Sequence, residues 1–119
     1  MSRDHRRLEV VNQADQLVLD VYRVSNSFPI HERYGLQSQI RRAAVSAACN
    51  IVEGSARRTT REYVHFLNVA TGSAAEAEYL ATVAERLEML AAGDADELTR
   101  GYAKLSASLR AMLRSLASG

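Results

Sequence analysis

The sequence is poor in residues that cross-link a chain or interrupt a helix. It contains one cysteine, Cys49, one proline and no tryptophan. A single cysteine excludes an intrachain disulfide and favours an intracellular setting. No run of about 18 apolar residues occurs, so the sequence predicts no membrane span. The polar start at residues 1–7 lacks the apolar core of a signal peptide, and we therefore expect a cytoplasmic protein.

The composition is that of an ordinary globular domain. The 119 residues are 47% hydrophobic and 24% charged, a balance that excludes disorder as the main state. The net charge of +1 conceals an uneven distribution, because residues 1–61 hold ten arginines and six acids, whereas residues 62–119 hold five bases and eight acids. This arginine usage either serves contacts with phosphate and carboxylate groups or reflects genome composition.

Apolar residues recur at steps of three and four along nearly the whole chain, which predicts helices and no strands. The expected helices cover about 7–27, 36–54, 60–91 and 95–117. Short connectors favour antiparallel neighbours. We therefore expect one all-α domain, residues 1–119, folded as an up-down-up-down antiparallel four-helix bundle.

Local signals set the expected helix ends. Pro29 ends the first helix, and Gly54-Ser55 ends the second. Thr59 and Glu62 have the spacing of a capping box before the third helix. Ala92-Gly93 is its expected stop, and Asp94 starts the fourth helix. Gly72-Ser73 in the third helix predicts a bend or a close helix crossing.

Signals of catalysis are weak. His5, His31 and His65 share no metal-ligand spacing, and Glu62 and His65 form only a single Glu-x-x-His pair, where di-iron bundles use two. Cys49 is expected mid-helix as a buried, inert thiol. No glycine-rich phosphate loop is present. We expect no enzyme activity, no cofactor and no metal.

The second predicted helix carries two unusual strips. At 100° per residue from Ser38, a polar strip lies between about 40° and 120° and an apolar strip between about −40° and 20°. The polar strip contains Arg42, Ser46, Asn50 and Glu53 together with Gln39. The apolar strip contains Val45, Cys49 and Val52.

Each strip has two interpretations. The polar strip is either a structural network that fixes helix register or a ligand site. In the structural interpretation, Arg42 and Glu53 are partly buried and paired through a third group or another helix. The apolar strip contacts either a second helix of the same bundle or a partner subunit.

Arginines gather at the turn before the third helix, where Arg57, Arg58 and Arg61 follow one another closely. Arg33, Arg41 and Arg42 lie earlier in the same half. Such a cluster is either a solvated surface or a contact for nucleic-acid phosphates. No aromatic residues of the kind that stack bases alternate with these arginines. Arg57, Arg58, Arg61 and Arg41 are the candidate nucleic-acid contacts.

The central segment carries a specific series of motifs, namely Ser27-Phe28-Pro29, Glu32-Arg33-Tyr34-Gly35-Leu36, Ser38-Gln39-Ile40-Arg41-Arg42-Ala43-Ala44-Val45-Ser46 and Asn50-Ile51-Val52-Glu53-Gly54. The next helix adds Glu62-Tyr63, Phe66-Leu67, Ala70 and Gly72-Ser73. In these motifs the chain resembles the four-helix-bundle proteins of the 23S rRNA intervening-sequence family over about residues 10–90. Val52 stands where the family usually has alanine, and Ala77 stands where it often has leucine.

The resemblance implies an up-down-up-down bundle and a homopentameric ring. A distantly similar group of basic pentameric barrels binds reverse transcriptase and nucleic acid. We therefore expect a non-enzymatic oligomeric scaffold or accessory protein that contacts RNA, DNA or a nucleoprotein partner. The alternative is a protein–protein interaction module without nucleic-acid binding. An enzyme that uses Arg42, Asn50 and Glu53 is the third hypothesis.

Overall fold

Four long antiparallel helices form the molecule in a computed structural model that describes residues 2–118, with side chains described from His5 onward. They are α1 (Ser2–Ser25), α2 (Leu36–Ser55), α3 (Thr60–Arg86) and α4 (Ala92–Ser118), and the short 3-10 turn η1 (Ile30–Glu32) precedes α2. The bundle measures 46 × 24 × 17 Å. The described chain contains no strand, which confirms the all-α prediction. None of these helices is long and apolar enough to cross a membrane.

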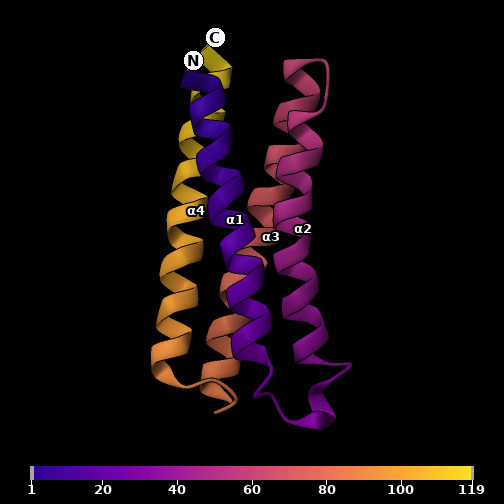
Figure 1. Ribbon diagram of the computed structural model, residues 1–119, viewed down its shortest axis with the longest axis vertical. Helices are drawn as coiled ribbons and strands as arrows, with labels where there is room; N and C mark the ends of the chain where they lie inside the picture. Colours follow the sequence, from indigo (N-terminus) through magenta and orange to yellow (C-terminus); the bar gives the residue numbers. More distant parts are fainter. Residues whose placement is uncertain (1, 119) are drawn as a thin grey trace.

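The helices follow one another around the bundle in an up-down-up-down arrangement (Figure 1). Each helix packs on its sequence neighbours, and α4 closes the bundle against α1. The two ends of the chain and the α2–α3 turn lie at one end of the bundle (Figure 1). The α1–α2 and α3–α4 connectors lie at the other.

The seam between α2 and α3 is the most extensive of the helix contacts, and the buried faces of both helices are rich in alanine. Small side chains let two helices approach closely, and at Gly54 even a methyl group has no room: an added Cβ would lie 2.9 Å from Cβ of Phe66 and 3.0 Å from the Tyr63 ring. Larger residues of α1 and α4, such as Leu105 and Leu109, fill the rest of the core. The buried alanines of the two helices are Ala43, Ala44 and Ala47 on α2 and Ala70, Ala74, Ala77, Ala81 and Ala84 on α3.

Of the pair Gly72-Ser73 that predicted a bend or a close crossing, Ser73 lies at the contact of α3 with α2, whereas Gly72 does not. Gly72 is exposed, and a Cβ added there would meet no atom within 4 Å. The close approaches lie at Gly54 and at Gly101, where an added Cβ would lie 2.6 Å from Cδ2 of Leu17.

The predicted start of α3 is confirmed. The Glu62 amide donates to Oγ1 of Thr59 at 3.1 Å, and the Thr59 hydroxyl donates to the Glu62 carboxylate at 2.9 Å. These bonds satisfy one of the free amides of the first turn and fix the carboxylate beside it.

The predicted end of α3 is wrong. The helix ends at Arg86, and Ala92 and Gly93 belong to the first turn of α4. Glu88 adopts a φ of 61°, and the amides of Glu88 and Met89 donate to the carbonyls of Glu85 and Ala84, each at 2.9 Å. This is the Schellman arrangement, which usually places glycine where Glu88 stands. Leu90, just beyond it, is buried and holds the turn in place.

Replacing Glu88 by glycine should therefore stabilise the protein. Glycine removes the cost of a left-handed residue with a Cβ, for an expected gain of about 0.5–1 kcal/mol in the free energy of unfolding. Chemical denaturation measures this change. Glu85→Gly, on the helical side of the same turn, is the matched control and should lose about 1 kcal/mol. A loss of stability in both variants would contradict the assigned turn.

Candidate functional site

Part of the predicted polar strip forms a hydrogen-bonded group between α2 and α3. The Ser46 and Ser73 hydroxyl oxygens lie 2.9 Å apart across the helix contact. The Asn50 side-chain amide donates to the Ser46 carbonyl at 2.8 Å and to the Ser46 hydroxyl at 3.2 Å. All three residues are half-buried. Ser46 thus joins α2 to α3, with Ser73 as a partner that the helical projection of α2 alone did not reveal, and Asn50 bonds to Ser46 within α2.

Arg42 and Glu53 lie outside this group, so the prediction that both are partly buried and paired through a third group is wrong for the single chain. Arg42 is exposed and makes no hydrogen bond or ion pair with any other described residue. The Glu53 side chain is 54% exposed, and its ion-pair partner is Arg57 at 3.9 Å. Both residues lie at about 40–60° on the helical projection, at the outer edge of the strip, where long side chains reach solvent.

The apolar strip of α2 faces solvent in the single chain. Val45 is 36% exposed and Val52 is 54% exposed, and Cys49 lies exposed between them. The expectation of a buried thiol at Cys49 is therefore wrong for the single chain. The opposite side of α2 carries its buried alanines and isoleucines, so the strip lies across the helix from the core.

Arg41 does not share a surface with the other candidate nucleic-acid contacts. It lies near the start of α2, at the opposite end of the helix from Arg57, Arg58 and Arg61. Its Nε donates to the Ser25 hydroxyl at 2.8 Å, and its Nη2 donates to Oδ1 of Asn26 at 3.0 Å and to the Tyr22 carbonyl at 3.3 Å. These bonds make Arg41 a tie between the end of α1 and the start of α2.

The remaining cluster is displayed at the α2–α3 turn. Arg57, Arg58 and Arg61 are exposed. The Arg57 guanidinium carbon lies 5.6 Å from the centroid of the Phe66 ring, whereas Arg58 and Arg61 make no ion pair within residues 2–118. Their charges are therefore available to a partner.

This turn belongs to a basic half of the bundle. Because α1 begins, α2 ends, α3 begins and α4 ends there (Figure 1), the arginines of several segments gather in one half. The described side chains of this half include seven arginines, namely Arg6, Arg7, Arg57, Arg58, Arg61, Arg110 and Arg114, and three acids, Glu9, Glu53 and Glu62. The described side chains of the opposite half comprise seven bases and ten acids. The charge is therefore uneven between the two ends of the molecule as well as along the sequence.

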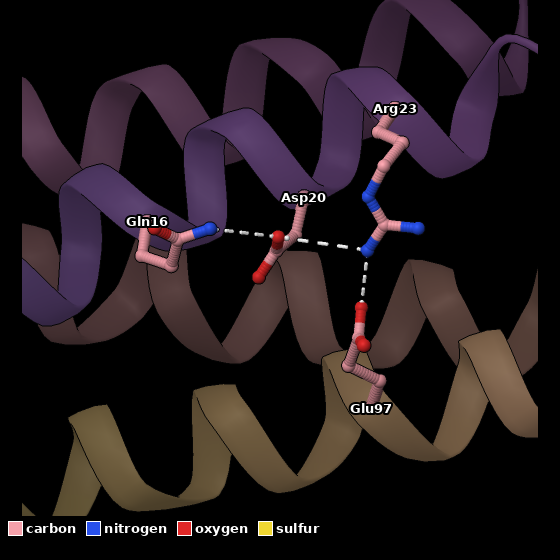
Figure 2. Close-up of polar contacts among 4 residues, drawn as sticks. All are labelled: Gln16, Asp20, Arg23 and Glu97. Carbon is pink, nitrogen blue, oxygen red and sulfur yellow. Dashed lines mark hydrogen bonds and ion pairs between the residues drawn. The ribbon is translucent and has the colours of Figure 1, made fainter.

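A polar group on the α1–α4 face was not anticipated from the sequence (Figure 2). Arg23 donates to Glu97 of α4 and lies 3.6 Å from Asp20, which accepts from Gln16 at 3.0 Å. The hydrogen bond to Glu97 raises the pKa of Arg23 above its usual range. Both members of the Arg23–Glu97 pair are more than half exposed, so this pair joins the helices with only a small effect on stability.

Tyr102 is buried beneath this group. Burial, together with the negative charge of Asp20, raises the pKa of the Tyr102 hydroxyl well above its ordinary value. Tyr102 is therefore neutral at physiological pH. Among residues 2–118, no three histidine, cysteine or acidic side chains converge in a way that could hold a metal ion.

Comparison with known proteins shows which family has this architecture. The family model of the 23S rRNA-intervening sequence protein matches residues 6–111. The chain belongs to this family. The match confirms the resemblance that the motifs between Ser27 and Gly54 indicated. A search of curated proteins gives no match.

A crystal structure from Bacteroides thetaiotaomicron shares the fold of this family member. It is described as a protein with unknown function from the S23 ribosomal protein family. The TM-score is 0.85 at 16% sequence identity, with 92% of this chain and 98% of that chain covered. At this identity the likeness concerns the fold alone.

The hydrogen-bonded group of Ser46, Asn50 and Ser73 predicts different losses of stability for two neighbouring substitutions on α2. Asn50→Ala should lower the free energy of unfolding by about 1 kcal/mol, because a half-buried pair of hydrogen bonds is lost. Glu53→Ala, one turn further along the same helix, should change it by less than about 0.5 kcal/mol, because its side chain is exposed. Urea denaturation of both variants makes the comparison. Equal losses would show that Glu53 belongs to the network after all.

Proposed function

We propose that this family member is a non-enzymatic scaffold that assembles through the outer face of α2 and presents its basic half to RNA or to a nucleoprotein partner. The apolar strip of Val45, Cys49 and Val52, exposed on the side of α2 that faces away from the core, carries this proposal. A helix with an apolar strip on each side usually has a neighbour on each side. Within the described chain, no helix packs on the apolar strip of Val45, Cys49 and Val52.

Self-association would place a helix of another copy of the chain against the apolar strip of α2. Copies joined by one repeated contact form a closed ring when the rotation between them closes, and the family resemblance favours five copies. A ring of this kind repeats Arg57, Arg58 and Arg61 around one face. Repetition converts weak phosphate contacts into useful affinity through multivalency.

The arrangement favours binding over catalysis. The side-chain amide of Asn50 is already hydrogen-bonded to Ser46, and Arg42 and Glu53 lie exposed and apart from each other. The three residues of the enzyme hypothesis therefore do not converge on one reacting atom. The alternative function, a protein–protein module without nucleic-acid binding, is favoured by the exposure of Ile30 and Tyr34, which are 84% and 89% exposed beside η1.

Val45→Glu should disrupt the assembly. A glutamate in the middle of the strip would place an unpaired charge in the contact between copies. Light scattering coupled to size exclusion should give a multimer for the wild type and a mass near 13.1 kDa for the variant. Ala103→Glu on the polar outer face of α4 is the control and should keep the multimer. A monomeric wild type at micromolar concentration would rule out the scaffold.

Replacing Arg57, Arg58 and Arg61 together by alanine should weaken nucleic-acid binding. Phosphate-driven binding falls as salt rises, and the slope of log affinity against log salt should become less steep by about one for each phosphate contact removed. Fluorescence polarisation with structured RNA at low and physiological salt provides the measurement. Absence of binding at low salt would leave the protein–protein module as the function.

A further inference from the structure

An open groove of about 560 Å³ lies beside η1, between the end of α1 and the start of α2. Grooves of this size hold small organic ligands and single nucleotides. Among its described lining residues are three arginines, two tyrosines and Ser38, and none is acidic. The arginines are Arg33, Arg41 and Arg42, and the tyrosines are Tyr22 and Tyr34. The groove thus combines guanidinium groups with aromatic rings in a half of the bundle that is otherwise rich in acids.

Arg41 forms a fixed part of the groove wall. Its hydrogen bonds to Ser25, Asn26 and the Tyr22 carbonyl fix the guanidinium group, whose central carbon lies 4.5 Å from the centroid of the Tyr22 ring. Arg41 therefore supplies a fixed positive charge at the wall that joins α1 to α2.

The rim of the groove is exposed in the single chain, and Val45 of the apolar strip also lines it. Arg33 and Arg42 are exposed and make no ion pair with a described residue. The Tyr34 ring is 89% exposed, and the Arg33 guanidinium carbon lies 5.9 Å from its centroid. The neighbouring acid, Glu32, accepts the Leu36 amide at 2.8 Å at the start of α2, so its carboxylate is directed at the helix end.

We propose that this groove binds single-stranded nucleic acid, with Arg33 and Arg42 on phosphates and the Tyr34 ring stacked on a base. Guanidinium groups bind phosphate through paired hydrogen bonds, and stacking of bases on aromatic side chains is the usual second element of single-strand recognition. The inference rests on the proposed nucleic-acid function and names a contact at the opposite end of α2 from Arg57, Arg58 and Arg61.

A single strand suits this groove better than a duplex or an acidic peptide. The excess of acids in the same half of the bundle repels an extended duplex backbone, whereas a flexible strand can place one or two phosphates between Arg33 and Arg42. An acidic peptide matches the arginines but has no planar base for the exposed Tyr34 ring. The group that the groove would recognise, a phosphate joined to a base, also occurs in a free nucleotide.

The test compares exposed substitutions on the complete protein, with circular dichroism to verify the fold. The probe is a fluorescein-labelled oligo(dA) of twelve residues, measured by polarisation at low salt. The double variant Arg33→Ala, Arg42→Ala and the single variant Tyr34→Ala should each bind about tenfold more weakly or worse. Tyr34→Phe keeps the ring and should bind like the wild type. Arg86→Ala, Arg100→Ala removes two charges from the same half outside the groove and should have little effect.

The outcomes separate the two proposals. Loss of binding in the groove variants, with most binding retained when Arg57, Arg58 and Arg61 are alanine, supports the groove. Binding that is retained in the groove variants and lost when Arg57, Arg58 and Arg61 are alanine overturns the groove proposal and leaves the basic half as the contact. No binding of oligonucleotide or structured RNA by the wild type overturns both.

Two competitors identify the ligand chemistry. Competition by polyglutamate as strong as that by unlabelled oligo(dA) would overturn base recognition in favour of an acidic peptide. Competition by adenosine monophosphate at similar concentration supports the groove with a free nucleotide as its source, and competition by the oligonucleotide alone supports a strand.

Discussion

Close contact between α2 and α3 is the constraint on which the rest of the structure depends. The buried faces of both helices are rich in alanine, and Gly54 passes Tyr63 and Phe66 where a methyl group would collide. Only at this separation can the Ser46 and Ser73 hydroxyls meet directly. Larger side chains in the seam would separate the helices, break this bond and rotate the outer face of α2.

The same constraint determines what the molecule presents to partners. With its small residues turned inward, α2 carries valines and Cys49 on its outer side. The up-down course then gathers arginines from three segments of the sequence in one half of the bundle (Figure 1). The proposed self-association through α2 and the proposed phosphate binding at the basic half use different surfaces of one helix pair, so they can operate together.

Sequence periodicity predicted the four helices because each has a buried stripe at helical spacing, and the Thr59–Glu62 pair predicted the start of α3 because a cap is a local interaction. The end of α3 was missed because packing beyond Glu88 imposes a left-handed residue where no glycine stands. Ser46 and Asn50 were recognised as network members, but the helical projection could not show that Arg42 and Glu53 reach solvent. The groove was missed because only the fold places Tyr22 of α1 beside Arg41, and because Tyr34, which directly follows Arg33, was not recognised as an aromatic residue among the arginines.

The reactivity of Cys49 tests the central claim, which is that the outer face of α2 is covered by another copy of the chain. Cys49 is the only cysteine and is exposed in the single chain, so a chromogenic disulfide reagent reports on this face alone. The account predicts that the rate of thiol modification in the folded wild type falls as protein concentration rises and returns to the exposed rate in Val45→Glu. A fast rate that is independent of concentration, equal in both proteins, would contradict it.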